Sequence, residues 1–161
     1  MTECIMVYSV RAASRMVKGL RNFEGKVGRV QDQVKRALRG RLAIYADRMV
    51  STAQDLVRED EGNLKNSIHW VWGSKVPPRV AVLGSVKGSD PDLIITIIAG
   101  DESTIVTNSR GIEFQNALIQ EFGSSHSSAH PYMRPSYARH QKAARSGMRR
   151  EAKKAWRRAL T

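Results

Sequence analysis

The chain has 161 residues and a hydrophobic fraction of 41%, so it is long enough to bury a core and too apolar to be wholly disordered. Its longest apolar run, Leu93–Gly100, is far too short to cross a bilayer, and Glu3 and Arg11 argue against a secretory signal. The single cysteine, Cys4, excludes an internal disulfide, and one domain over residues 1–161 is the default prediction.

The net charge of +12 is unevenly distributed along the chain. Residues 1–60 contain 12 basic and 7 acidic side chains, residues 61–133 contain 5 and 7, and residues 134–161 contain 10 and 1. The middle is therefore slightly acidic and the two ends are basic. A field of this size indicates an anionic partner, which can be nucleic acid, an acidic protein surface or an anionic membrane.

Residues 1–15 have no clear periodicity. Ile5–Val10 alternates loosely and fits an added strand, while residues 12–14 fit either a turn or a frayed helix. We expect this N-terminal extension to become ordered only against a neighbouring subunit.

A helix is predicted from Lys26 to Val57, because apolar residues recur there at steps of three or four. Gly40 lies inside it and costs about 1 kcal/mol relative to alanine, so a local bend is expected there. Gly62 and Asn63 are a plausible stop. The apolar stripe of this helix consists of Val27, Val30, Val34, Leu38, Leu42, Tyr45, Met49, Ala53 and Leu56.

The middle of the chain has the composition of β-strands. Ser67–Trp72, Arg79–Val86 and Leu93–Ala99 are rich in β-branched or aromatic residues and are separated by turn signals. They predict an antiparallel meander with one face on the long helix, which is an α+β architecture. Asp101–Gly111 is predicted to be a polar loop, and Ile112–Phe122 a short helix, although a strand fits it as well.

The last predicted element is an amphipathic helix over Pro135–Leu160, with a thin, alanine-rich apolar stripe. Its cations fit a solvated helix face and contact with DNA phosphates or an acidic neighbouring subunit about equally well. The candidate contact residues are Arg139, Lys142, Arg145, Arg149, Arg150, Lys153, Lys154, Arg157 and Arg158.

No catalytic, cofactor or metal site is predicted. His126 and His130 are four residues apart, but they lie in a serine-rich loop beside Pro131, without clustered cysteine or carboxylate ligands. The chain has no G-x-S-x-G elbow and no glycine-rich phosphate loop. Trp70 and Trp72 share one strand face and are interpreted as packing residues.

The stretch Ala117–Ser136, ALIQEFGSSHSSAHPYMRPS, contains two element boundaries. Gly123 permits a left-handed backbone, and Pro135 suits a first helical position. The order E-F-G-S, a polar gap and H-P-Y-M-R-P resembles the tail-completion or neck proteins of long-tailed bacteriophages. Two further stretches match in the right order: Met16–Leu20, MVKGL, resembles the opening strand of that family, and Gly62–Ile68, GNLKNSI, resembles a later junction.

The resemblance implies a structural virion protein that binds without chemistry. It implies a ring, expected to be a hexamer, at the head–tail junction, with the head connector or stopper and the tail terminator or tube as partners and with DNA passing through the lumen. Outside the virion, the protein would be in the host cytoplasm during assembly. The residues expected to set the backbone geometry at the boundary where the apolar segment ends are Glu121, Phe122 and Gly123. Those expected to place the last helix are Pro131, Tyr132, Arg134 and Pro135.

Within this motif, Arg134 is expected to pair with Glu121. The chain departs from the family pattern in its N-terminal extension and in His130 before Pro131. The alternative is a free, basic nucleic-acid-binding protein that uses its C-terminal helix.

Overall fold

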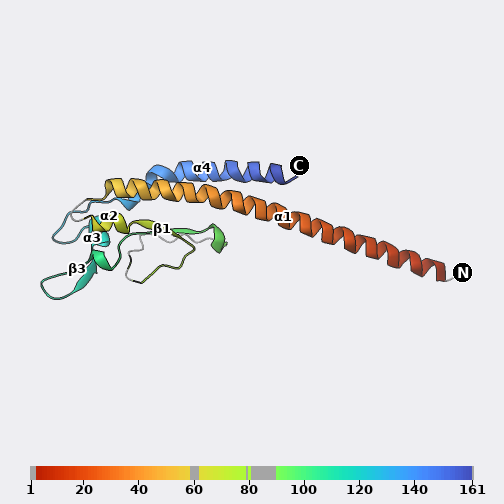
Figure 1. Cartoon of the computed structure of the whole chain (residues 1–161), viewed down its shortest axis with the longest axis horizontal. Helices are drawn as coiled ribbons and strands as arrows, with labels where there is room; N and C mark the ends of the chain where they lie inside the picture. The colour runs from red at the N-terminus through yellow and green to blue at the C-terminus, as the bar shows by residue number, and fades with distance from the viewer. Residues whose placement is uncertain (1–2, 59–61, 79, 81–89, 161) are drawn as a thin grey trace.

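The computed structural model describes residues 3–58, 62–78, 80 and 90–160. It has the predicted α+β architecture, with a long first helix, small antiparallel sheets and a long last helix (Figure 1). The elements in chain order are α1 (Glu3–Leu56), α2 (Asn63–Ser67), β1 (His69–Trp72), η1 (Pro91–Leu93), β2 (Ile95–Ile98), η2 (Glu102–Thr104), β3 (Ile105–Thr107), β4 (Glu113–Gln115), α3 (Asn116–Phe122) and α4 (Met133–Leu160).

Helix α1 is a single helix of 54 residues. The predicted start at Lys26 and the expected strands at Ile5–Val10 and Met16–Leu20 are therefore wrong. Apolar residues also recur at helical spacing before Lys26, and no proline interrupts the run. The helix continues through Gly40 as well, where a Cβ atom would meet nothing within 4 Å.

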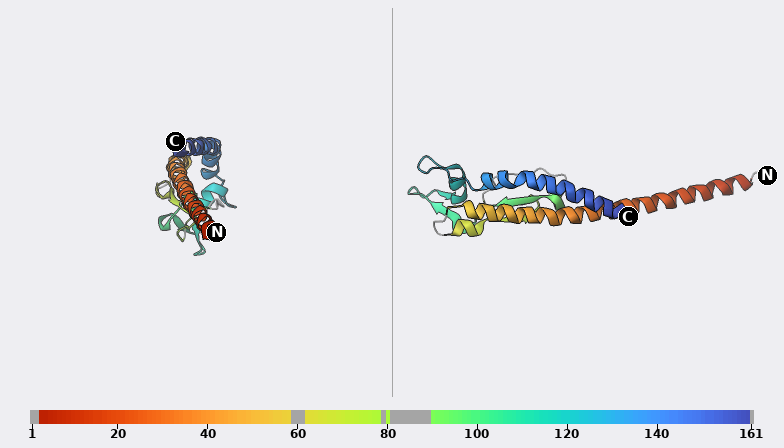
Figure 2. Two further views of the ribbon diagram at one scale, coloured as in Figure 1. Left: turned by 90° about the vertical axis from the view of Figure 1, so that its right-hand side faces the viewer. Right: turned by 90° about the horizontal axis from the view of Figure 1, so that it is seen from above.

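The N-terminal part of α1 projects away from the rest of the molecule (Figures 1 and 2). We call residues 3–29 the arm, because Val30 is the first buried side chain among residues 23–56, the part of α1 whose side chains are described. Phe23, near the end of the arm, is 65% exposed. At 1.5 Å per residue, the arm is about 40 Å long.

Helix α4 runs antiparallel to the C-terminal half of α1 (Figure 2). The Ser136 hydroxyl donates a hydrogen bond of 2.6 Å to the Met49 carbonyl oxygen, and Thr52 Oγ1 and His140 Nε2 are hydrogen-bonded at 2.8 Å. These bonds hold the start of α4 against α1. Within the apolar stripe predicted from the sequence, Tyr45 and Ala53 are buried.

The hydrophobic core lies where the C-terminal end of α1 meets α2, α3, the end of β2 and the start of α4. Three of its seven side chains are alanines, which let these short elements approach one another closely. Its members are Ala53, Val57, Leu64, Ile68, Ala99, Ala117 and Tyr132.

Strand β1 pairs directly with β2, in an antiparallel register that places His69 opposite Ile98 and Trp72 opposite Ile95. The predicted meander, which needs Arg79–Val86 between these strands, is therefore wrong. Apart from Val80, that segment lies outside the described residues. The two tryptophans pack on α1 as interpreted: Trp70 Nε1 donates to Asp47 Oδ1 at 2.7 Å. Trp72 stacks edge-on against Trp70, with the ring centroids 5.3 Å apart.

The segment predicted to be a polar loop contains a short helix, η2, and a hairpin formed by β3 and β4. The Asp101 side chain caps η2 by accepting a hydrogen bond from the Ser103 N–H group at 2.8 Å. Hydrogen bonds from polar side chains thus organise a stretch that has little hydrophobic periodicity. Both alternatives for Ile112–Phe122 are present, since strand β4 is followed directly by α3.

Candidate assembly site

The junction between α3 and α4 is built around the carboxylate of Glu121, which is only 2% exposed. Glu121 Oε2 accepts hydrogen bonds from the backbone N–H groups of Tyr132 and Met133, each at 2.9 Å. Glu121 Oε1 accepts one from the Arg134 N–H group at 3.0 Å. These are the N–H groups that a helix leaves without internal partners at its first turn, where a negative charge is also favourable. Glu121 therefore fixes where α4 begins.

Tyr132 packs at the same junction and bonds to α3. Its ring is fully buried, and its hydroxyl donates to the Ala117 carbonyl oxygen of α3 at 3.3 Å. Burial, and to a lesser extent the nearby Glu121 carboxylate, raise the pKa of Tyr132 well above its ordinary value. The hydroxyl therefore stays protonated and remains a donor at neutral pH.

Gly123 ends α3 with a φ angle of 77°, as its position in the motif suggests. A Cβ atom there would lie 2.9 Å from Ala129 N and Ser127 O. Both the backbone conformation and the close approach of the following loop therefore require glycine. The loop is tied back to α3 by a bond of 2.7 Å from the His130 N–H group to the Gln120 carbonyl oxygen.

The expected pairing of Arg134 with Glu121 is made by the backbone of Arg134 and not by its charge. The Arg134 guanidinium instead lies over the Phe122 ring, 4.8 Å from the ring centroid. Pro135 is the third residue of α4 rather than the first, and it is exposed, as is Pro131. A proline in the first helical turn removes no hydrogen bond, so this position is compatible with the helix.

Helices α1 and α4 approach each other closely at Gly147, which the sequence analysis missed. A Cβ atom at Gly147 would lie 2.9 Å from Cζ of Tyr45 and would also clash with the Tyr45 hydroxyl oxygen. The guanidinium groups of Arg41 and Arg48 lie 5.2 and 5.7 Å from the centroid of the same ring. A lone glycine inside an alanine-rich helix was the available signal for this contact.

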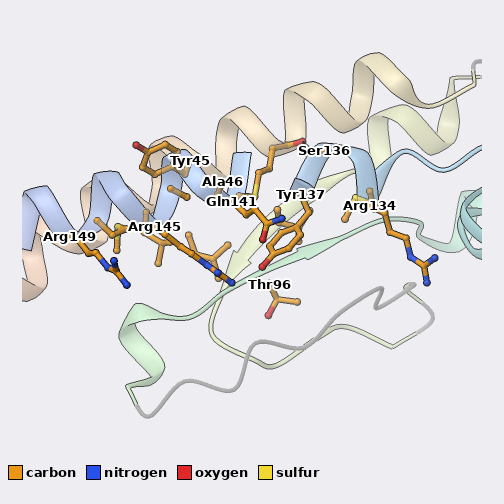
Figure 3. Close-up of a pocket in the computed structure, with 16 residues that line it drawn as sticks. Tyr45, Ala46, Thr96, Arg134, Ser136, Tyr137, Gln141, Arg145 and Arg149 are labelled. Carbon is orange, nitrogen blue, oxygen red and sulfur yellow. Dashed lines mark hydrogen bonds between the residues drawn. The ribbon is translucent and has the colours of Figure 1, made fainter. Parts of the chain in front are cut away.

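A largely apolar groove of about 750 Å³ lies between α1, β2 and α4 (Figure 3). Most of its lining is aliphatic or aromatic, and three arginines of α4 contribute to it. We call it the groove. Its lining residues are Leu42, Tyr45, Ala46, Met49, Ile95, Thr96, Ile97, Met133, Arg134, Ser136, Tyr137, Gln141, Ala144, Arg145, Met148 and Arg149.

All nine predicted contact cations of α4 are exposed. They occupy more than one face of the helix: Arg145 and Arg149 line the groove, and five others surround a separate concavity of about 350 Å³. We call these five the basic cluster, which consists of Arg150, Lys153, Lys154, Arg157 and Arg158. Their contact with DNA or with a partner protein stays a prediction.

An ion-pair cluster joins α1 to η1. Lys35 Nζ lies 2.6 Å from Asp92 Oδ2 and 3.1 Å from Asp90 Oδ2, and Arg39 Nη1 lies 3.9 Å from Asp92 Oδ1. The hydrogen bond from Lys35 lowers the pKa of Asp92, while hydrogen bonds to Asp92 and Asp90 raise the pKa of Lys35. Arg39 also lies over the Trp72 ring, 4.3 Å from its centroid. We call this cluster the η1 clip.

His126 and His130 are both exposed in the loop after α3. Within the described ranges, no three histidine, cysteine or acidic side chains are grouped so as to hold a metal ion. In the same part of the chain, no helix has the length and apolar character needed to cross a membrane. The arrangement of caps, groove and exposed cations is suited to protein assembly.

Comparison with known proteins identifies the family. Residues 15–123 match the model of the HK97-gp10-like family, described as "Bacteriophage HK97-gp10, putative tail-component". The match contains Glu121, Phe122 and Gly123 and ends just before the loop that leads to α4. No curated protein and no solved structure matches the chain. From the residues matched, the chain belongs to the HK97-gp10-like family of bacteriophage tail components.

Proposed function

We propose that copies of this chain form a ring, expected to contain six subunits, that completes the tail or neck of the virion and joins it to the head. In this proposal one side of the ring meets the head connector or stopper, and the other meets the tail terminator or tube. DNA passes through the lumen. Membership in a family of tail components supports the virion location and a structural, non-catalytic role.

The observation that carries the proposal is the distribution of exposed apolar side chains. Phe23 on the arm, Ile112 after the tip of the hairpin and Trp156 on α4 are 65%, 57% and 53% exposed. Phe122 on α3 and Tyr137 on α4 are also exposed. We infer from the spread of these large apolar side chains over separate elements that the subunit contacts more than one neighbour. A ring subunit between two other rings has such neighbours on its sides and on both ends.

The test is to introduce an amber mutation into the gene in a phage that carries it. We expect filled heads and separate tails in electron micrographs, and expect gold-labelled antibody against this chain to bind the head–tail junction of wild-type virions. Normal virions from the amber mutant, or gold label at the distal end of the tail, would contradict the proposal.

The second candidate function is nucleic-acid binding by α4, which is favoured by the five cations of the basic cluster. A free binder of this kind would hold duplex DNA as a monomer or dimer, and its affinity would fall steeply with salt because bound counterions are released. Light scattering after size exclusion, at low and high salt and with and without duplex DNA, separates the two functions. A discrete ring that forms without DNA favours the structural role.

A further inference from the structure

The groove has the features of a docking site for a protein segment. Its floor is formed by aliphatic side chains from α1 and β2, including Leu42, Met49 and Ile97, and Met148 of α4 also lines it. Arg145 and Arg149, which are one helical turn apart, place two positive charges along the α4 side. A matching segment must therefore present apolar side chains together with carboxylates.

The β3–β4 hairpin of the same chain has this chemistry. Val106 and Ile112 are exposed apolar residues, and Glu113, next to Ile112, is an exposed carboxylate. Asp101, just before the hairpin, is also exposed, and its charge is not neutralised by its bonds to the uncharged Ser103.

The hairpin is ordered before any partner binds. Asn108 Oδ1 accepts hydrogen bonds of 2.9 Å from the N–H groups of both Arg110 and Ile112. The Gly111 N–H group donates to the Asn108 carbonyl oxygen at 3.0 Å, and Gly111 itself has a φ angle of 75°. Because this turn is already formed, little conformational entropy is lost when the hairpin docks. The hairpin lies at the end of the molecule opposite the arm, where it can reach another copy (Figure 1).

Charge also favours contact between these two surfaces. Residues 101–115, which include the hairpin, contain three carboxylates and one cation, whereas α4 contains ten cations and one carboxylate. The arm does not fit the basic side of the groove as well, since residues 3–29 contain six cations and two carboxylates. Of these two segments, the hairpin is the one whose charge complements the basic side of the groove.

We propose that the β3–β4 hairpin of one copy docks into the groove of the next copy, with Ile112 and Val106 on the apolar floor and Glu113 facing Arg145 and Arg149. The two surfaces are different, so the contact is heterologous and can be repeated from copy to copy until a ring closes. This inference rests on the proposed ring and names the contact that forms it.

The test measures self-association by sedimentation velocity at low salt, where charge complementarity is least screened. The groove variant is Arg145→Glu/Arg149→Glu, and the hairpin variants are Glu113→Arg and Ile112→Ser. Each should lower the association constant at least about tenfold, while circular dichroism shows the same fold. The matched control is Arg150→Glu/Lys154→Glu, which makes the same charge change at the same helical spacing outside the groove and should leave association within about twofold of wild type.

The decisive experiment mixes the groove variant with Glu113→Arg. In the mixture, each reversed groove can receive a reversed hairpin and each wild-type groove a wild-type hairpin, so association should recover although neither variant assembles alone. No recovery on mixing, an equal loss in the control, or a wild-type chain that stays monomeric would overturn this contact. Gold label at the head–tail junction would still support the proposed function in that case, so the two failures are distinguishable.

Discussion

The carboxylate of Glu121 accepts hydrogen bonds from three backbone N–H groups at the start of α4. Glu121 itself belongs to α3, which ends at Phe122. A buried charge is stable there because the helix dipole and three donors compensate for its lost hydration. Tyr132 and Ser136 add bonds to α3 and α1 from the same turn. The direction of α4 therefore depends on a few side chains near residue 121.

Glu121→Gln should reduce the free energy of unfolding by about 2–3 kcal/mol, because one of the two acceptor oxygens is replaced by an amide that cannot accept. Urea denaturation followed by circular dichroism measures the change. Glu113→Gln, at an exposed position of β4, is the control and should change stability by less than about 0.5 kcal/mol. Equal effects of the two substitutions would argue against the capping role.

Two glycines in helix interiors should respond oppositely to the same substitution. Gly147→Ala should destabilise the chain by about 1–3 kcal/mol, because the new methyl group meets the Tyr45 ring at the α1–α4 contact. Gly40→Ala meets nothing within 4 Å and should stabilise it by about 0.5–1 kcal/mol through helix propensity. Thermal and urea unfolding measure both. A stabilising Gly147→Ala would show that the two helices can separate at little cost.

Among the elements, α1 has two parts in different surroundings. Its C-terminal half is held by α4 and the β1–β2 sheet, whereas the arm projects into solvent (Figure 2). Most of the stability of a helix in a protein comes from packing of an apolar face against other elements. The stability of the arm therefore depends on assembly more than that of the C-terminal half of α1 does.

Hydrogen exchange should show this difference directly. Amides of residues 3–22 should exchange rapidly in the isolated chain and become protected in virions or purified rings, while amides around Ala53 stay protected in both. Strong protection of the arm in a dilute monomer would contradict this expectation.

The η1 clip should depend on pH. Because the pKa of Asp92 is lowered from 3.8, the clip's contribution is complete above that value and is lost as the pH falls through the lower folded-state value. The pKa of Lys35 is raised from 10.5, so its contribution is complete below 10.5 and is lost at higher pH. The Leu93 amide, which donates to Asp90 O in η1, is the probe.

We expect the protection factor of the Leu93 amide to be constant from about pH 5 to 9 and to fall towards pH 2. Asp92→Asn should lower it at pH 7 and remove most of the acid dependence. An Asp92→Asn variant with wild-type protection at pH 7 would show that the clip does not hold η1.

For the molecule as a whole, the separation of charge is the dominant feature. Helix α4, with ten cations and one carboxylate, lies beside α1, whereas residues 90–122 contain six carboxylates and one cation. This separation favours ordered contacts between copies, and it leaves the basic cluster at the C-terminal end of α4 for a further anionic partner.

Reversal of Arg150, Lys153 and Lys154 to glutamate should leave the free energy of unfolding within about 0.5–1 kcal/mol of wild type, since all three side chains are exposed. If the cluster binds DNA phosphates, the slope of log affinity against log salt should become shallower by about 0.9 for each phosphate that is no longer neutralised. Fluorescence anisotropy with labelled duplex at several salt concentrations measures it. An unchanged slope would assign the cluster to a protein partner.

The sequence by itself determined the class of this protein. Helical spacing predicted the body of α1 and nearly all of α4, β-branched runs predicted β1 and β2, and the E-F-G-S motif led to the right family. These features are local, because they depend on periodicity or on the backbone needs of residues such as Gly123.

Only the tertiary structure decided what those residues do. It showed that Glu121 caps the helix that begins at Met133, that Gly147 admits the Tyr45 ring, and that β1 pairs with β2 across a long connection. The β3–β4 hairpin was missed because side-chain bonds from Asp101 and Asn108 organise that region rather than an apolar pattern. Such interactions either join residues that are distant in sequence or depend on the geometry of polar side chains. Neither kind of interaction produces a periodic pattern in the sequence.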